Sequence, residues 1–476
     1  MKPRIQFWTE SSKPSNAPCE HRMQVDETIT LEDTARTARQ AAHIGSGKIR
    51  VLLKRWNASD GAPVFTVGGR YKTRSWTNWT QGFLHGQALL CFEMTGESDL
   101  LKTARQLVHL HMGKHVTHLG VHDHGFNCVS TYGNLRRLML QKTMPYDEWE
   151  LNYYELAIKV SGAVQAARWT SLPDGLGFIH SFNGKHSLFI DTIRTLRICA
   201  LSHLLGHELL GEQDFKTSLL DRLLIHARTS ATFNIYYGAG RDSYDIPELT
   251  GRTAHEAIFN PVSGQFRCPS SQQGYSPFTT WTRGLAWAML GAAEQIEFLQ
   301  SIGDETQNKS AIQSTIELLL KAAQATCDFY IGKATARDGI CYWDTGAPGL
   351  AKLEDWQGQD AEPANQFEPV DSSASAIAAQ GLLRLGHLLG SRGKRYSAAG
   401  LTVARTLFGP TYLCGRTDHE GLLLHTIYHR PNGWDYVPIP GLVPHGESSM
   451  WGDYHLVELA LLICRLAEGG YYTFFQ

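Results

Sequence analysis

The sequence predicts an all-α fold, and within that class a closed toroid of six helical hairpins, the (α/α)6 barrel. Apolar residues recur at i, i+3, i+4 and i+7 through most of the chain, as in the run from Leu188 to Leu201. Alternating strand patterns are few, and joints containing Gly or Pro separate the helical segments. The predicted helices are 29–55, 79–94, 98–115, 148–168, 188–209, 214–230, 279–300, 309–331, 372–390, 395–408 and 449–467.

An open α-solenoid is the alternative arrangement for helices that follow one another in pairs. A solenoid repeats one signature at a fixed period of about 34 to 47 residues. This sequence has no such period, and its connecting loops differ in length and carry Trp, His and Asp. A closed barrel with functional loops at its mouth therefore fits better.

Composition narrows the class of protein. The 476 residues include 44 Lys+Arg and 46 Asp+Glu, a net charge of −2, so neither nucleic acid nor a membrane surface is an expected partner. With 42% hydrophobic and 19% charged residues the chain is expected to fold. Aromatic residues make up 10% of the chain and include 12 Trp, and wet aromatic clefts such as those of sugar-binding enzymes use Trp and Tyr in this way.

The domain prediction is an N-terminal arm over 1–27 and a single barrel domain over 28–476. The arm is polar, contains three prolines and lacks the apolar core of a signal peptide. The sequence has no run of 18 apolar residues, so we expect no membrane span. The nine cysteines are scattered without a C-x-x-C pair, which predicts reduced, mostly buried thiols and a cytoplasmic location.

Two segments in the first third of the chain contain candidate site residues. In 75–96, Trp76 and Trp79 stand at a helix start, and glycines inside the helix indicate close approach by a backbone or a ligand; ordinary aromatic packing is the alternative. The segment 108–127 contains six histidines, and Asp123 lies between the last two of them. A metal site is one hypothesis, although no H-E-x-x-H is present. We favour Asp123 as a functional carboxylate, and the alternative is a turn cap before Gly125.

Asp191 is the one carboxylate in the apolar segment 184–206. Asp is a poor residue for a helix interior and is costly to bury unpaired. Such a position would raise its pKa and keep it protonated, as a general acid requires. A salt bridge to Arg194 or Arg197 is the alternative.

The segment 255–290 is the most specific. A polar loop with Gln272 and Gln273 leads into a helix that carries Trp281, Arg283 and Trp287, with Thr279 or Thr280 as the expected N-cap. Arg283 is suited to grip a carboxylate, and the tryptophans offer faces on which a ring can stack. Further along, Asp371 is expected to cap a helix and Asp453 to have a structural role.

These motifs occur in the order found in glycoside hydrolase family 88, and the chain resembles the unsaturated glucuronyl hydrolases of that family over roughly residues 30–470. The motifs are WTNWTQGF (76–83), HDHGF (122–126), FIDTIRTL (189–196), HEAIFNP (255–261), QQGYSPFTTWTRGLAW (272–287), PVDSSASAIAAQGLL (369–383) and MWGDYHLVEL (450–459).

The resemblance implies an (α/α)6 barrel that uses no metal or other cofactor. It also implies hydrolysis of oligosaccharides that end in a 4,5-unsaturated uronic acid, in which an Asp protonates C4 and water adds at C5. By motif match, Asp191 is the proton donor and water activator, and Asp123 is the second carboxylate, expected to stay ionised. The residues implied to line the sugar subsite are Trp79, His122, His255, Gln273, Trp281, Arg283 and Trp287.

Three departures from the family pattern bear on the site: Arg194 and Thr195 after Asp191, Phe182 in place of a Trp, and a loop over 428–435 without the Ser, Ser and Lys of members that bind sulfated sugars. An unsaturated rhamnogalacturonyl hydrolase and a non-catalytic sugar-binding barrel are the alternative functions. Monomer and homodimer both remain open as the assembly.

Overall fold

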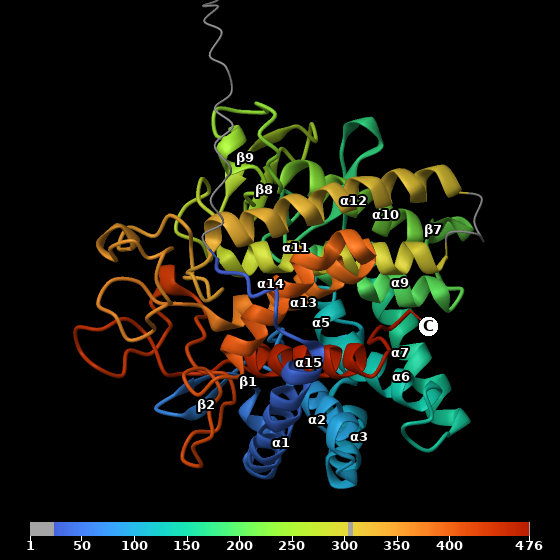
Figure 1. The fold of residues 1–476 in the computed structure, drawn as a ribbon. Helices are drawn as coiled ribbons and strands as arrows, with labels where there is room; N and C mark the ends of the chain where they lie inside the picture. The colour runs from blue at the N-terminus through green and yellow to red at the C-terminus, as the bar shows by residue number, and fades with distance from the viewer. Residues whose placement is uncertain (1–22, 303–307, 476) are drawn as a thin grey trace, which may run out of the picture.

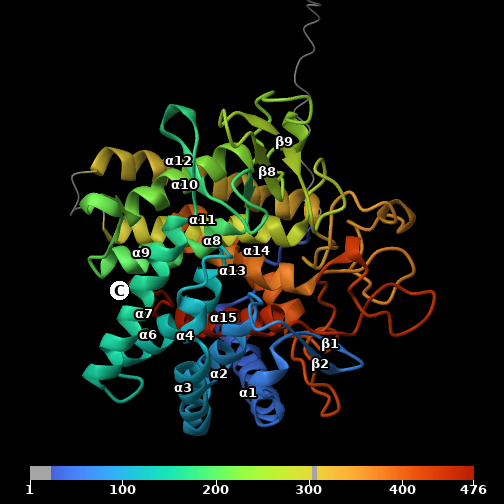
Figure 2. The ribbon, with the colours of Figure 1, turned by 180° about the vertical axis from the view of Figure 1, so that it is seen from behind.

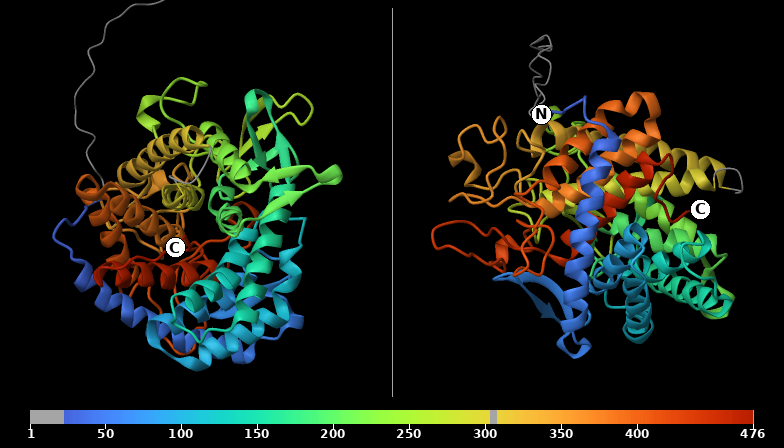
Figure 3. Two further views of the ribbon diagram at one scale, coloured as in Figure 1. Left: turned by 90° about the vertical axis from the view of Figure 1, so that its right-hand side faces the viewer. Right: turned by 60° about the horizontal axis from the view of Figure 1, so that its bottom comes forward.

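The structure is a computed structural model, and it describes residues 23–302 and 308–475. Residues 1–22 of the predicted arm lie outside the described residues. Two concentric layers of helices form a ring (Figures 1 and 3). The outer layer consists of α1 (Leu31–Arg55), α3 (Ser98–His111), α7 (Glu148–Ala167), α10 (Leu219–Phe233), α12 (Lys309–Phe329) and α14 (Lys394–Leu407).

The inner layer alternates with the outer one along the chain. Its members are α2 (Gln81–Thr95), the continuous run α5 (His124–Cys128), η2 (Val129–Gly133) and α6 (Asn134–Leu140), then α8 (Thr192–Thr195) with α9 (Arg197–Leu204), α11 (Thr282–Ser301), α13 (Ser372–Leu389) and α15 (Met450–Ala467). Each inner segment packs against the next, and α15 packs back against α2 and α1. The ring is therefore closed, which confirms the (α/α)6 barrel and excludes the open solenoid.

One inner segment is absent from the sequence prediction. No predicted helix covers 124–140, yet this segment is helical, with a π-helical turn, η2, in its middle. Almost every residue of this segment is buried, so it has no polar face to produce an amphipathic pattern. The predicted helix 188–209 is also wrong in detail, because strands occupy both of its ends and only 192–204 is helical.

Glycines in α2 allow the first two inner segments to touch. A Cβ on Gly82 would lie 2.4 Å from the backbone oxygen of Asn127, and one on Gly86 would lie 2.7 Å from that of Ser130. Gly82 N donates to Asn127 Oδ1 at 2.8 Å. The close approach of another backbone, predicted from these glycines, is confirmed.

Short antiparallel strands lie in the connections between the barrel helices. They pair as β1 (Ala62–Val67) with β2 (Arg70–Arg74), β3 (Trp169–Ser171) with β4 (Gly177–Ile179), β6 (Glu208–Leu210) with β7 (Lys216–Ser218), and β8 (Glu256–Phe259) with both β5 (Ser187–Phe189) and β9 (Phe266–Ser270). The shorter helical turns are α4 (Gly113–Val116), η1 (Ala58–Asp60), η3 (Pro173–Gly175), η4 (Glu212–Asp214), η5 (Pro247–Leu249), η6 (Tyr330–Ala334), η7 (Leu350–Lys352), η8 (Gly390–Gly393) and η9 (Arg430–Asn432).

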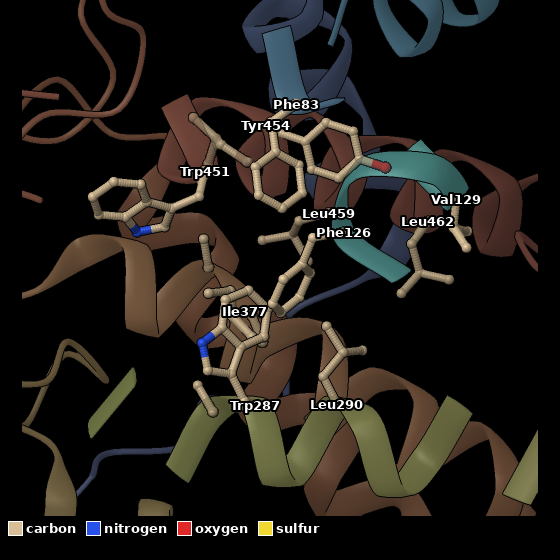
Figure 4. Packing of buried hydrophobic residues seen from close by; sticks show 14 of the residues in the cluster. Phe83, Phe126, Val129, Trp287, Leu290, Ile377, Trp451, Tyr454, Leu459 and Leu462 are labelled. Carbon is tan, nitrogen blue, oxygen red and sulfur yellow. The ribbon is translucent and has the colours of Figure 1, made fainter. Parts of the chain in front are cut away.

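Two long connections, between α12 and α13 and between α14 and α15, emerge at the same end of the molecule as β1 and β2 (Figures 1 and 2). The barrel centre is filled by aromatic and aliphatic side chains, including Phe83, Phe126, Trp287 and Tyr454 (Figure 4). Among the described cysteines none forms a disulfide, and all but Cys268 are buried. No helix in the described part of the chain is long and apolar enough to cross a membrane.

Candidate active site

A pocket of about 490 Å³ collects most of the residues that the sequence singled out. Of these, Trp79, His122, Asp123, Asp191, Gln273, Trp281, Arg283 and Trp287 line it, and His255 does not. The other lining residues are Phe126, Phe182, Phe189, Gln272, Tyr428, His429, Asn432 and Trp434. Segments from almost the full length of the chain therefore build a single cavity.

Asp123 enters this pocket from the start of an inner helix. It immediately precedes α5, whose first residues run against α8: a Cβ on Gly125 would lie 2.1 Å from the backbone oxygen of Thr195. This contact holds the segment that carries Asp123 close to the one that carries Asp191. Burial raises the pKa of Asp123; the nearby His122 opposes the rise, and the charge of Asp191 adds to it.

The periodicity predicted that Asp191 lies inside a helix, and this prediction is wrong. It follows β5 directly and occupies the residue before α8. The pairing of β5 with β8 fixes this junction, since Ile190 N donates to the carbonyl of His255 at 2.9 Å. Neither Arg194 nor Arg197 pairs with Asp191; both arginines form buried ion pairs with Glu294 and Glu458.

His122 connects the two carboxyl groups. Its Nε2 lies 3.2 Å from Asp191 Oδ1 and 3.7 Å from Asp123 Oδ1, and the imidazole is almost fully buried. Burial alone would lower the pKa of His122, but the two carboxylates outweigh it and raise this pKa above its ordinary value. The two carboxyl groups and the imidazole thus meet at a single point of the pocket wall.

Aromatic rings form much of the remaining wall. The ring centroids of Trp79 and Trp451 lie 5.1 Å apart. Those of Phe126 and Trp287 lie 4.9 Å apart, and Figure 4 shows these two rings side by side. Phe182, which replaces a Trp of the family pattern, is 56% exposed and stacks on His122 with an interplanar angle of 20°. These rings offer flat apolar faces to a ligand.

Arg283 is bound to the protein on several sides. Its Nη1 donates to Asp371 Oδ2 at 2.8 Å and to the carbonyl of Ile427, and its Nη2 donates to Gln273 Oε1 and to the carbonyl of Tyr428. The expected bidentate grip on a ligand carboxylate would compete with these bonds. Because Gln273 accepts from Arg283 through Oε1, its amide NH2 is the group left to donate to a ligand.

His255 stands behind the wall. Its Nδ1 accepts from Gln272 N at 3.0 Å and Gln273 N at 3.4 Å, so the ring supports the loop that carries both glutamines. Its ring centroid lies 4.6 Å from that of Trp281. Burial lowers the pKa of His255 to about 4, and the imidazole is neutral near pH 7.

The histidines of 109–124 do not gather at one point, because they contact different parts of the structure. His124 Nδ1 bonds Ser161 Oγ at 2.7 Å, His115 packs against Trp76, and His109 bonds Tyr154. Within residues 23–302 and 308–475, no group of three or more His, Cys, Asp or Glu side chains is arranged to hold a metal ion.

Comparison with known proteins gives a consistent answer. No family model matches the chain. The unsaturated glucuronyl hydrolase of Bacillus sp. (strain GL1) is 24% identical over 430 residues, which cover 87% of this chain and 92% of the relative. This chain is a relative of the unsaturated glucuronyl hydrolases.

Two further comparisons agree. The unsaturated chondroitin disaccharide hydrolase of Streptococcus pyogenes serotype M1 is 23% identical over 91% of this chain and 94% of its own length. The crystal structure of the unsaturated glucuronyl hydrolase from Bacillus sp. GL1 matches with a TM-score of 0.67 and 22% identity, covering 92% of this chain and 99% of that chain. The barrel of the unsaturated glucuronyl hydrolases is therefore the fold of this chain.

Proposed function

We propose that this protein is a glycoside hydrolase that releases the 4,5-unsaturated uronic acid from the non-reducing end of oligosaccharides produced by polysaccharide lyases. The observation that carries the proposal is the convergence of Asp123 and Asp191 on one nitrogen of His122 in an aromatic-walled pocket. This arrangement supplies a proton donor, an anion and a stacking surface within one cavity.

The names of the relatives support this reading. They are hydrolases of unsaturated glucuronyl and unsaturated chondroitin disaccharide substrates. Solved neighbours are described as complexes with dGlcA-Glc-Rha-Glc and with dGlcA-GalNAc6S. The sugar next to the unsaturated uronic acid thus differs among them.

The proposed reaction is hydration of the C4=C5 double bond. Asp191 gives its proton to C4, and positive charge develops at C5 and the ring oxygen. Water adds at C5 and returns a proton to Asp191, so the carboxyl ends each cycle as it began. The resulting hemiketal opens to a ketone at C5, and the sugar on the reducing side leaves with its own oxygen.

The surrounding groups have complementary roles. Ionised Asp123 would stabilise the positive charge at C5, because charge developing in a water-poor pocket is sensitive to a fixed anion. His122 lies at hydrogen-bond distance from Asp191 and orients its carboxyl group. The amide NH2 of Gln273 donates to the uronate carboxylate, and the unsaturated ring stacks on the tryptophans.

Asp191→Asn tests the proposal. The variant should lose about 10³-fold or more of the rate at which an unsaturated disaccharide loses its ultraviolet absorbance, while its circular dichroism and Tm stay unchanged. Asp60→Asn, at an exposed position in η1, is the control and should keep full activity. Full activity in Asp191→Asn would refute the assignment of the acid.

A screen on both pectin-derived and glycosaminoglycan-derived unsaturated oligosaccharides addresses the alternative functions. Faster turnover of the pectin products would favour a rhamnogalacturonyl hydrolase. Calorimetric binding with no product after long incubation would favour a sugar-binding barrel.

The buried free thiols fit a reducing compartment, and we keep the cytoplasm as the expected location.

A further inference from the structure

The thiol of Cys414 lies beside a lysine side chain. Lys48, from α1, donates from Nζ to Cys414 Sγ at 3.6 Å. The same ammonium group donates to the carbonyls of Arg416 and His419 at 2.8 and 2.7 Å, and these two bonds fix it against the turn that follows Cys414. By contrast, the buried thiol of Cys464 donates to a backbone carbonyl. Cys414 therefore has a fixed cation next to its sulfur.

An imidazole and a carboxylate complete the surroundings of this sulfur. The side chain of His419 is 3% exposed and contacts Cys414. Its Nε2 lies 3.7 Å from Glu447 Oε2 and makes no hydrogen bond of normal geometry with the residues that the structure describes. Glu447 is itself held in place, since Gly69 N donates to its Oε2 at 3.1 Å. The buried Nε2 is thus available to a small polar molecule that enters beside the sulfur.

These neighbours favour the thiolate form of Cys414. Burial alone would raise the pKa of this thiol. The contact with His419, the backbone N–H of Arg416 and the charge of Lys48 outweigh burial and hold the pKa below its ordinary value. Burial instead raises the thiol pKa to about 12 at Cys91, Cys128, Cys199 and Cys341. Because the thiolate is the nucleophile, Cys414 is prepared to react where these four are not.

A surface pocket of about 390 Å³ lies against the Cys414 site. Its lining residues include Lys48, Gly415 and His419, and none of the described residues that line it also lines the candidate active site. Cys414 itself is 2% exposed, so a bulky reagent has no direct route to the sulfur. A small uncharged molecule can approach it from this pocket.

We propose that Cys414 is a modification site, at which hydrogen peroxide oxidises the thiol to a sulfenic acid with the help of Lys48 and His419. The thiolate sulfur attacks one peroxide oxygen, a sulfur–oxygen bond forms and the O–O bond breaks. Sulfur loses two electrons, and the departing hydroxide takes a proton from His419 Nε2 and leaves as water. The new oxygen then accepts a hydrogen bond from Lys48 Nζ. This inference does not depend on the proposed function.

The first test traps the sulfenic acid in the native protein. The protein is treated briefly with hydrogen peroxide in the presence of dimedone, and peptide mass spectrometry measures the rate of adduct formation at each cysteine. The adduct should form at least tenfold faster at Cys414 than at Cys268, the exposed thiol that serves as the internal control. Equal rates, faster reaction at Cys268 or no adduct at Cys414 would overturn the inference.

The second test removes the neighbouring cation. Lys48→Met should slow adduct formation at Cys414 at least tenfold and raise the pH at which iodoacetamide alkylates this thiol at half its maximal rate. Lys54→Met, at an exposed position of the same helix, is the matched control and should keep the wild-type rate and pH.

Circular dichroism checks the fold of both lysine variants. If Lys48→Met does not fold, His419→Gln takes its place with the same expected loss of adduct. An unchanged rate and an unchanged pH at Cys414 in a folded variant would show that its neighbours do not activate this thiol, and the inference would be wrong.

Discussion

Arg283 and Asp371 form a buried ion pair, 2.8 Å from Nη1 to Oδ2, that joins α11 to α13 beneath the pocket. Asp371 also caps α13 by accepting from Ser373 N and Ala374 N, which confirms the capping role predicted for it. The arginine in turn holds Gln273 and the carbonyls of the 428–435 loop. One ion pair therefore links the barrel core to two parts of the pocket wall.

Asp371→Asn should destabilise the protein by about 3–5 kcal/mol, because it leaves the buried Arg283 cation without its counter-ion. The free energy of unfolding in urea measures this loss. Asp418→Asn provides the contrast, since the Arg416–Asp418 pair is fully exposed and its loss should leave that free energy nearly unchanged. Equal effects of the two substitutions would contradict a special role for the buried pair.

Gly125→Ala should reduce both stability and activity. The new methyl group would collide with the backbone of Thr195 and push α5 away from α8, which increases the separation of Asp123 and Asp191. Overpacking of this kind costs about 1–3 kcal/mol, and we expect kcat to fall by at least tenfold. At Gly113, nothing lies within 4 Å of an added Cβ. Gly113→Ala should therefore keep wild-type kcat and stability, and a loss in both variants would point to a general intolerance of alanine.

His122→Gln should shift the pH dependence of kcat/KM. The protonated imidazole lowers the pKa of Asp123, so its removal lets this pKa rise further above the ordinary value. If Asp123 must be ionised for turnover, the acidic limb of the profile moves to higher pH in the variant. The same substitution at His43, an exposed residue of α1, should leave the limb in place. A shift to lower pH in His122→Gln would contradict the proposed coupling.

Gln273→Glu should weaken the grip on the uronate carboxylate. The variant keeps an oxygen for Arg283 but replaces the amide donor with a second acceptor. A hydrogen bond to a charged group contributes about 1.5–3 kcal/mol, so kcat/KM should fall by about 10- to 100-fold. Gln300→Glu, exposed near the end of α11, is the control. An unchanged KM for Gln273→Glu would show that the carboxylate binds elsewhere.

The sequence predicts the barrel well because its outer helices have one polar face and one apolar face. Helices such as α1 and α14 show this pattern clearly, and their predicted limits differ from the observed ones by no more than two residues. The inner segment 124–140 was missed for the opposite reason. A helix buried on all sides has no periodic pattern, and a π-helical turn disturbs the spacing further.

Burial also explains why parts of the site were predicted wrongly from the sequence. The expected helix around Asp191 came from apolar spacing, but a short buried strand can also be rich in apolar residues, and β5 is buried throughout. Thr279 and Thr280 suggested a helix start, whereas α11 begins at Thr282 after Trp281. Trp434, Asn432 and His429 had no signal beyond the resemblance, because a loop distant in sequence reaches the pocket only through tertiary packing.

The closure of the ring depends on segments from both ends of the chain, so it must come late in synthesis. Trp79 rests on Trp451, so one wall of the cavity is completed only when α15 docks against α2. A ribosome must therefore deliver nearly the whole polypeptide before the hollow can exist. During synthesis, the apolar faces of α1 and α2 stay uncovered until α15 is made, some 370 codons later. Exposed apolar surface of this kind favours aggregation, so we expect nascent chains of this architecture to bind chaperones.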